Sequence, residues 1–321
     1  MRINNPFFHF LGVVFVSLCW GMGGPACFFV TRTLSAAETT FGRCAFAFLG
    51  LSPFFLTNGI SGFMALSTRG KALIASSGTL LGIHFYFFVS GIAHASLATA
   101  VTLVAVEPVL ILAVGVLFFK ERLTTASKIG VLSCLIGMFL ISALPHLISH
   151  SVETTQDRTF GDACAVLAVL TYALYYGLNR SLKAEEDRLP GAPSPLIRGF
   201  GFASVLYLFA AISSGAICYL TQFKMPFSHP SPGHSVWLAL IALGFIPTIL
   251  GHTLNQILSR VANPVWISLM SPGETLISIA IGFVFMNQTL RPFDALGGLF
   301  ILSGVLITLR GELKASPHVE V

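Results

Sequence analysis

Long apolar segments separated by short polar connections follow one another along almost the whole chain. A helix needs about 20 mainly apolar residues to cross the roughly 30 Å of hydrocarbon in a bilayer. The pattern therefore predicts an all-α integral membrane protein with ten transmembrane helices. We expect them at residues 8–30, 37–56, 72–91, 96–118, 128–145, 160–178, 198–220, 235–257, 263–286 and 293–310. The connections between them hold 4–19 residues, which leaves no room for a soluble domain.

The composition agrees with this pattern. Of 321 residues, 55% are hydrophobic and 10% are charged, whereas an ordinary soluble domain is about 25% charged. We interpret the formal charge of +5 as a signal of membrane orientation and not of nucleic-acid binding. The apolar run that begins at Phe7 has no convincing cleavage site and is too long for the core of a signal peptide, so we expect it to be the first spanning helix.

The positions of Lys and Arg set the orientation. With the N-terminus inside, 13 of these residues fall on the inner side and 4 on the outer side, while Arg43 lies within the second span. The inner residues are Arg2, Arg69, Lys71, Lys120, Arg122, Lys128, Arg180, Lys183, Arg188, Arg198, Arg260, Arg310 and Lys314, and the outer ones are Arg32, Arg158, Lys224 and Arg291. Because cytoplasmic loops are enriched in Lys and Arg, we expect a multi-pass protein of the cell (inner) membrane with both termini in the cytoplasm.

Two stretches of the sequence match each other. A shift of 167 positions places residues 107–137 on residues 274–304 with nine identities, among them Glu107 on Glu274. A shift of 168 places His84 on His252. Five helices in each half is an odd number, so the halves must lie in opposite orientations, as in many secondary transporters. We therefore predict two inverted five-helix repeats.

The repeat divides the chain into four parts. The first five-helix repeat is expected at residues 1–146, an external linker at 147–159, the second five-helix repeat at 160–312 and a cytoplasmic tail at 313–321.

Glu107 and Glu274 lie near the middle of apolar spans and at matching positions of the repeat. A carboxylate at bilayer depth costs at least ~2.5 kcal/mol and is rarely present without a purpose. The pair therefore predicts a transport site at the repeat interface. Pro108 follows the first glutamate, and Pro272 and Gly273 precede the second. We therefore expect a weak point in each helix beside its carboxylate, where backbone groups are freed to face a cavity.

Other polar and aromatic residues at bilayer depth are candidates for the same site, and several recur on one helical face. The candidate substrate-binding or coupling residues are Glu107, Glu274, His84, His252, Arg43, Trp20, Trp266, Tyr172, Asn255 and Gln256.

Each candidate also has a purely structural interpretation. The histidines could serve as interhelical hydrogen-bonding groups, and Trp266 and the tyrosines could belong to the aromatic belt at the membrane surface. Arg43 could extend to the bilayer surface or pair with a carboxylate. For the two glutamates the alternative is a contact with an arginine or with the backbone. An apolar environment disfavours the charged form of a carboxylate, which suits such a group to proton exchange.

Several other kinds of site are not indicated. None of the six cysteines lies in a C-x-x-C spacing, so we interpret them as small buried residues. His146 and His150 have no third ligand at a useful spacing, and neither a metal site nor a cofactor is predicted. The chain contains no H-E-x-x-H, G-x-S-x-G or Walker A motif, so an integral-membrane enzyme is a distant alternative. A non-transporting membrane scaffold is a second, and no filter-like loop favours a channel.

The sequence resembles the EamA family of the drug/metabolite transporter superfamily over about residues 10–310. The residues that carry the resemblance are Trp20-Gly21, Arg43, Glu107-Pro108, Glu121, Gly130 and Gly137. In one respect the halves differ, because Asn287-Gln288 stand in the second half where the first has Lys120-Glu121.

The resemblance implies a ten-helix secondary carrier with a central cavity between two EamA-like halves. It also implies small-metabolite substrates, often amino acids or their derivatives, and similar members include S-adenosylmethionine importers or exchangers and amino-acid exporters.

We expect transport by alternating access. The glutamates would attract a cationic or zwitterionic substrate or carry a coupling proton. Trp20, Tyr172 and Trp266 would stack on the substrate. Our best single substrate is S-adenosylmethionine, taken up or exchanged against S-adenosylhomocysteine. The alternative is an amino-acid or amino-acid-derivative exporter or proton-coupled permease. Expected partners are the substrate, a coupling proton or counter-substrate, the lipid bilayer and a second copy of the chain in a homodimer, with no nucleic acid.

Overall fold

The computed structural model is helical throughout the part of the chain that it describes, residues 6–120, 124–142, 144, 156–189, 195–223, 225–227, 232–258, 270–287 and 289–315. The helices are α1 (Pro6–Gly21), α2 (Gly23–Val30), α3 (Ala36–Phe54), η1 (Phe55–Gly59), α4 (Ile60–Ala65), α5 (Thr68–His94), α6 (Leu97–Val104), α7 (Glu107–Phe119), α8 (Thr125–Ser142), α10 (Gln156–Glu186), α11 (Pro195–Gln222), α12 (His234–Leu243), η2 (Gly244–Thr253), α13 (Leu254–Leu258), α15 (Met270–Met286) and α16 (Pro292–Ala315). Each expected segment coincides with one helix or with a short series of helices, although residues 263–269 of the ninth lie outside the described ranges.

Within these ranges, seven helical segments are long and apolar enough to cross a membrane. They are Leu11–Val30, Ala36–Ala65, Thr68–His94, Leu97–Phe119, Asp157–Glu186, Ile197–Gln222 and His234–Leu258. The helices at Thr125–Ile141, Met270–Met286 and Pro292–Thr308 are apolar but shorter. Large apolar side chains such as Leu117, Phe118 and Phe285 are exposed on the outside of the bundle, as a surface in contact with lipid requires.

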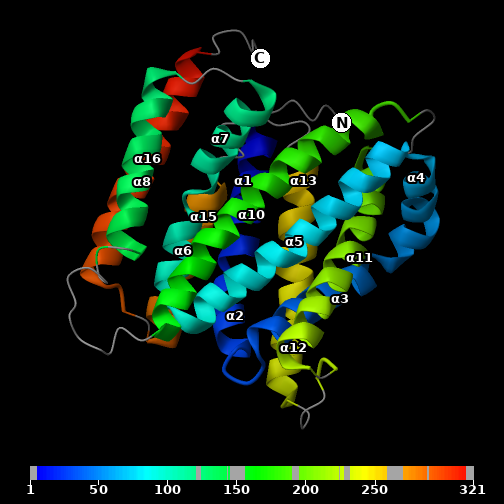
Figure 1. Ribbon diagram of the computed structural model, residues 1–321, viewed down its shortest axis with the longest axis horizontal. Coiled ribbons are helices and arrows are strands. Elements are labelled where there is room, and N and C mark those ends of the chain that lie inside the picture. The colour runs from blue at the N-terminus through cyan, green and yellow to red at the C-terminus, as the bar shows by residue number, and fades with distance from the viewer. Residues whose placement is uncertain are drawn as a thin grey trace.

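Successive long helical segments run in alternating directions, with α1 and α2 forming one segment and α6 and α7 another (Figure 1). The start of α1 and the end of α16 lie at the same end of the molecule. α5 lies along α10, α8 along α16, and α3 packs against α11. α1 contacts α15 and η2. Helices from the first and second halves of the chain therefore meet throughout the bundle.

Glycines bring α8 and α16 into close contact. A Cβ atom added to Gly130 would lie 2.5 Å from the carbonyl oxygen of Gly304, and one added to Gly304 would lie 2.6 Å from that of Gly130. Gly137 and Gly297 have the same relation, at 2.6 and 2.7 Å. Small residues at such positions let two membrane helices approach backbone to backbone. The two contacts are reciprocal, because each glycine meets the carbonyl group of its partner.

The expected weak point beside Glu107 is confirmed, since α6 ends at Val104 and α7 begins at Glu107 with two turn residues between them. Beside Glu274, α15 is continuous from Met270 to Met286, and Pro272 lies in its first turn. A proline there leaves the carbonyl group four residues earlier without a donor. That carbonyl belongs to residue 268, outside the described residues, so the weak point beside Glu274 stays a prediction.

Three irregularities appear where we predicted regular helix. The first span is interrupted at Met22, between α1 and α2. The second span widens into the π-helix η1 directly after Pro53, and the eighth into the π-helix η2 around Pro247. Such segments are rare and frequently occur at functional sites. Both prolines lie within apolar segments, and they are the local sequence signal for these changes.

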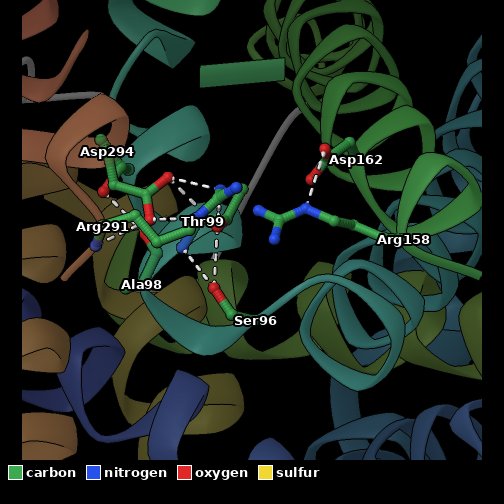
Figure 2. A network of polar contacts seen from close by, with 8 residues as sticks. Ser96, Ala98, Thr99, Arg158, Asp162, Arg291 and Asp294 are labelled. Atoms are coloured by element: carbon green, nitrogen blue, oxygen red, sulfur yellow. Dashed lines mark hydrogen bonds and ion pairs between the residues drawn. The ribbon is translucent and has the colours of Figure 1, made fainter. Parts of the chain in front are cut away.

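Polar side chains join α6 to α16 at the end of the bundle opposite the start of α1 (Figures 1 and 2). Arg291 binds the carboxylate of Asp294 through Nε and an Nη atom at 2.8 and 2.6 Å, and it also donates to the hydroxyl of Thr99 at 2.7 Å. Nearby, Arg158 and Asp162 of α10 form a looser ion pair at 3.9 Å (Figure 2). The bidentate arginine–carboxylate geometry fixes the start of α16 against α6.

All six cysteines are buried and none forms a disulfide. This confirms their interpretation as small apolar residues of the helix interior.

Candidate functional site

A small cavity lies where the irregular segments meet. It is lined by side chains from both halves of the chain, namely Trp20, Gly23, Arg43, His84, Phe85, Phe88, Val104, Glu107, Pro247, His252 and Glu274. Its volume is about 20 Å³, which is room for about one water molecule. Six of the ten residues predicted for the site therefore meet in one place.

Both glutamates face this cavity and are nearly inaccessible, with 4% of Glu107 and 8% of Glu274 exposed. They lie near enough to repel each other electrostatically. Glu107 is the first residue of α7, where the positive end of the helix dipole favours a negative charge by about 0.3–1 kcal/mol. Glu274 lies within α15 and has no such helix terminus, but it is close enough to Arg43 to be attracted by it.

Hydroxyl groups of α15 hold the interrupted helices beside the carboxylates. Ser271 donates to the carbonyl group of Val104 at 3.0 Å, and Ser278 donates to that of Gly21 at 2.8 Å. These carbonyls lie at the ends of α6 and α1, and the residues four positions later, Pro108 and Pro25, have no N–H group to donate to them. The interruptions are thus stabilised by neighbouring side chains, as membrane proteins require.

Arg43 is the buried cation of the cavity, with 2% of its surface exposed. Its Nε donates to the hydroxyl of Thr248 at 2.7 Å, and its guanidinium carbon lies 3.7 Å from the centre of the Phe85 ring. One terminal nitrogen has no hydrogen-bond partner. Although all three residues are described, no ion pair within 4.0 Å joins Arg43 to Glu107 or Glu274. Arg43 therefore neither reaches the surface nor pairs directly with a carboxylate, contrary to both structural interpretations.

The contacts of Arg43 offset a large part of the cost of burying its charge. Desolvating a charge costs several kcal/mol after relaxation, by order of magnitude. The stack on Phe85 contributes about 2 kcal/mol when desolvated, and a hydrogen bond to a charged group contributes about 1.5–3 kcal/mol. The attraction between Arg43 and Glu274 adds to these contacts.

Aromatic rings close the rest of the wall. The ring centres of Trp20 and His252 are 4.8 Å apart, those of Phe85 and His252 are 5.0 Å apart, and those of His84 and Tyr172 are 5.0 Å apart. Nδ1 of His84 also lies 2.9 Å from the carbonyl oxygen of Ala168. This histidine thus makes the interhelical hydrogen bond of its structural interpretation while its ring faces the cavity.

The remaining predicted residues lie behind this wall or beyond the described ranges. Asn255 donates to the hydroxyl of Tyr172 at 3.3 Å, and Gln256 donates to that of Tyr175 at 2.6 Å. Neither amide lines the cavity, and Tyr172 reaches it only through its ring contacts with Trp20 and the two histidines. Trp266 lies outside the described residues.

Two features were missed by sequence reasoning. Phe85 supports Arg43 from α5, and its only local signal is its place next to His84. Thr248 anchors Arg43 from η2, and its carbonyl group accepts a hydrogen bond from Tyr207 at 2.9 Å. A sequence does not show which residue of another helix meets Thr248.

Comparison with known proteins adds to this geometry. A protein crystal structure with 18% sequence identity superimposes on 96% of this chain and 99% of its own, with a TM-score of 0.63. At that identity the likeness shows a shared fold alone. Residues 8–143 match the EamA-like transporter family. The resemblance to the EamA family is confirmed.

Two uncharacterized transporters match nearly the full length of this chain. An uncharacterized transporter of Bacillus subtilis, YxxF, is 27% identical over 91% of this chain and 88% of its own. The uncharacterized inner membrane transporter YicL of Salmonella typhimurium is 26% identical over 95% of this chain and 96% of its own. Together with the long apolar helices, these matches support a multi-pass membrane transporter.

Proposed function

We propose that this EamA-like protein is a secondary active transporter that moves a small polar metabolite across the cell membrane by alternating access. The observation that carries the proposal is the central cavity, where two buried carboxylates, one buried arginine and a wall of aromatic rings meet. Ionisable groups at this depth mark substrate or ion pathways. They also lie at the interface between the two halves, where substrate sites of repeat-built transporters are found.

The proposal includes two inverted five-helix repeats, and the contacts between helices support it. In the proposed repeat α1 corresponds to α10, α7 to α15, α3 to α11 and α5 to the span that contains η2. The contact of α1 with α15 is therefore equivalent to that of α10 with α7, and the contact of α3 with η2 is equivalent to that of α11 with α5. Both members of each pair are present. The pairs α3–α11 and α8–α16 each consist of two corresponding helices, and these contacts are present too.

Contacts between residues separated by the repeat shift give further support. Ser133 donates to the carbonyl group of Phe300 at 2.8 Å, and Ser271 donates to that of Val104 at 3.0 Å. In each pair the two residues are 167 positions apart. A residue meets its own repeat equivalent where a pseudo-two-fold axis passes between them.

The size of the cavity supports a conformational step. Room for about one water molecule cannot hold a metabolite, so substrate entry requires a second conformation in which the cavity opens to one side. The interruptions at Met22 and between α6 and α7 are places where helix halves can tilt relative to each other. Exchange then follows from the different affinities of the two conformations for substrate.

S-adenosylmethionine is our best single substrate, in uptake or in exchange against S-adenosylhomocysteine. The cavity supports this choice by its acids, which suit a cationic group, and by its rings, which suit a planar base. Amino acids or their derivatives, exported or carried with protons, are the second candidate, favoured by the presence of both signs of charge. We propose that the protein lies in the inner membrane with both termini in the cytoplasm, because 13 Lys and Arg residues are expected on that side against 4 on the other. The homodimer stays a prediction.

The deciding experiment is uptake of radiolabelled S-adenosylmethionine into proteoliposomes. We expect saturable flux that internal S-adenosylhomocysteine accelerates. A pH dependence that disappears in Glu107→Gln would identify proton coupling, with Lys128→Gln as a control outside the cavity. Flux no greater than in empty liposomes, from protein shown to be folded, would remove this substrate and leave the amino acids to be tested in the same way.

A further inference from the structure

We propose that the second turn of η2, residues 249–253, is a conformational switch of the transporter. It has the π register while the cavity is closed, and it changes to the α register when the cavity opens, which moves His252 away from the cavity wall. This inference rests on the proposed transport function and identifies the part of the wall that moves.

The length of η2 is the first observation. η2 contains 10 residues, whereas η1 contains 5, and π-helical segments in proteins are mostly single turns. α12 ends at Leu243 directly before it. Directly after it, the N–H group of Leu254 donates to the carbonyl groups of Leu250 and Gly251, four and three residues earlier. Because π-helical hydrogen bonds span five residues, η2 holds more residues per turn than the α-helices on either side.

Pro247 explains the π register at the start of η2 but not in its second turn. Pro247 has no N–H group, so in an α-helix the carbonyl group of Leu243, four residues earlier, would have no donor. The hydroxyl of Thr248 donates to this carbonyl at 2.8 Å instead. Residues 249–253 contain no proline. Their π register therefore has another cause.

Contacts from three other helices hold this second turn. Tyr207 of α11 donates to the carbonyl group of Thr248 at 2.9 Å, and Arg43 of α3 donates to its hydroxyl at 2.7 Å. Trp20 of α1 lies against Gly251, because a Cβ atom added to this glycine would lie 2.5 Å from Cδ1 of the indole ring. Trp20 and Arg43 also line the cavity. The packing that maintains the π register is thus the packing of the closed cavity.

One buried hydroxyl favours the α register. In the α-helices of this protein, Thr39, Thr40 and Thr102 donate to the carbonyl group four residues earlier. Thr253 is fully buried, but its hydroxyl makes no hydrogen bond. In the α register the carbonyl group of Ile249 would be within its reach. Buried polar groups are nearly always hydrogen-bonded, so a second register in which this hydroxyl has an acceptor is favourable.

The change of register acts on His252. An α-helix has 3.6 residues per turn, so a shift by one residue rotates the side chains beyond it by about 100°. The ring centre of His252 lies 4.8 Å from that of Trp20 and 5.0 Å from that of Phe85. Rings packed this closely lose contact after such a rotation. The aromatic part of the wall then separates, and the cavity gains space on that side.

The competing explanation is that η2 is a fixed adaptation to Pro247. A fixed π-helix keeps the same hydrogen bonds in every conformation of the protein. A switch opens its hydrogen bonds each time that it changes register, and its amide groups then exchange with solvent. Hydrogen exchange in residues 249–253, compared with α12, therefore separates the two explanations without the use of a substrate.

The test measures hydrogen–deuterium exchange of the full-length protein in lipid nanodiscs and, in parallel, flux in proteoliposomes. We expect exchange in residues 249–253 to be at least about tenfold faster than in α12. Deletion of Leu250, whose side chain is exposed, removes the extra residue of the turn and leaves it only the α register. The deletion variant should stay folded, and its exchange in this segment and its flux should each fall at least about tenfold.

Tyr207→Phe is the second variant. It keeps the shape of the ring and removes the hydrogen bond to the carbonyl group of Thr248, so the shift should become easier. Exchange in residues 249–253 should rise about two- to tenfold, the factor that corresponds to one neutral hydrogen bond. Tyr219→Phe is the matched control, because Tyr219 is an exposed residue of the same helix, and exchange should not change.

Three results overturn the inference. They are equal exchange in residues 249–253 and α12, exchange that the deletion of Leu250 does not slow, and natural flux in the folded deletion variant. If the deletion variant does not fold, Tyr207→Phe decides, and exchange equal to that of Tyr219→Phe overturns the inference. Each of these results leaves the transport function intact. The absence of flux for every substrate, with the expected exchange pattern, instead contradicts the proposed function.

Discussion

At the scale of residues, Glu107 and Glu274 occupy equivalent places in the sequence but different places in the backbone. Glu107 begins a helix after an interruption, whereas Glu274 lies inside a continuous one. The helix dipole of α7 therefore favours a negative charge on Glu107, whereas Arg43 attracts Glu274. The two groups are nevertheless part of one electrostatic unit, because they face the same cavity and repel each other.

This coupling leads to a prediction for the two glutamine variants. Glu107→Gln and Glu274→Gln should each reduce flux of a cationic or zwitterionic substrate at least about tenfold, the factor expected for one hydrogen bond to a charged group. Combined, they should reduce it by less than the product of the single effects, because residues that act on one ligand group are not additive. Initial rates in proteoliposomes give the three values. Strictly multiplicative losses would mean that the glutamates act independently.

The sequence identified the charged members of the site because charge at bilayer depth is rare. Arg43, Glu107, Glu274 and the two histidines could be selected on that ground alone. Phe85 and Thr248 could not, because phenylalanine and threonine are ordinary in such helices. Their importance comes from a contact with Arg43 that depends on how α3, α5 and η2 pack. The charged residues of the site could thus be predicted from the sequence, whereas the residues that hold Arg43 in position could not.

At the scale of elements, local rules predicted some interruptions and not others. Pro108 correctly indicated the end of α6, since a proline favours the first turn of a helix. Pro272 lies in the first turn of α15, where a proline is tolerated, and α15 continues past Glu274. Pro247 is the local sign of the change in the eighth span, where the π-helix η2 brings Pro247 and His252 to the cavity wall.

The glycines of α8 and α16 give a prediction at this scale. Gly130→Val and Gly137→Val should each destabilise the protein by about 1–3 kcal/mol, the usual cost of overpacking. Gly297→Val and Gly304→Val should have matching effects, because the contacts are reciprocal. Thermal unfolding in detergent measures all four. Gly233→Ala is the control, since nothing lies within 4 Å of a Cβ atom added there.

The outcome also bears on the proposed repeat. If the variants in α8 are severely destabilised while their counterparts in α16 are unaffected, the two helices are not equivalent. The pseudo-symmetry of this pair would then be a feature of the sequence without an energetic counterpart.

At the scale of the whole molecule, the apolar segments predicted the order and positions of the helices well. This succeeded because the length of a spanning helix is set by the bilayer and not by tertiary contacts. The shorter helices α8, α15 and α16 could not be judged as spans by length alone. The packing of α8 on α16 was not predicted either, although the glycines responsible were among the residues matched by the repeat.

The orientation in the membrane gives the last prediction. The turn before α12 and the start of α8 lie at opposite ends of the bundle (Figure 1), and Gly233 and Lys128 are exposed there. The excess of Lys and Arg places the Lys128 end in the cytoplasm. A membrane-impermeant maleimide applied to intact cells should therefore label Gly233→Cys, and it should label Lys128→Cys only after the cells are permeabilised. The native protein provides a low background because all six cysteines are buried. Labelling of Lys128→Cys in intact cells, with Gly233→Cys protected, would reverse the orientation, and labelling of both would contradict the proposed arrangement of spans.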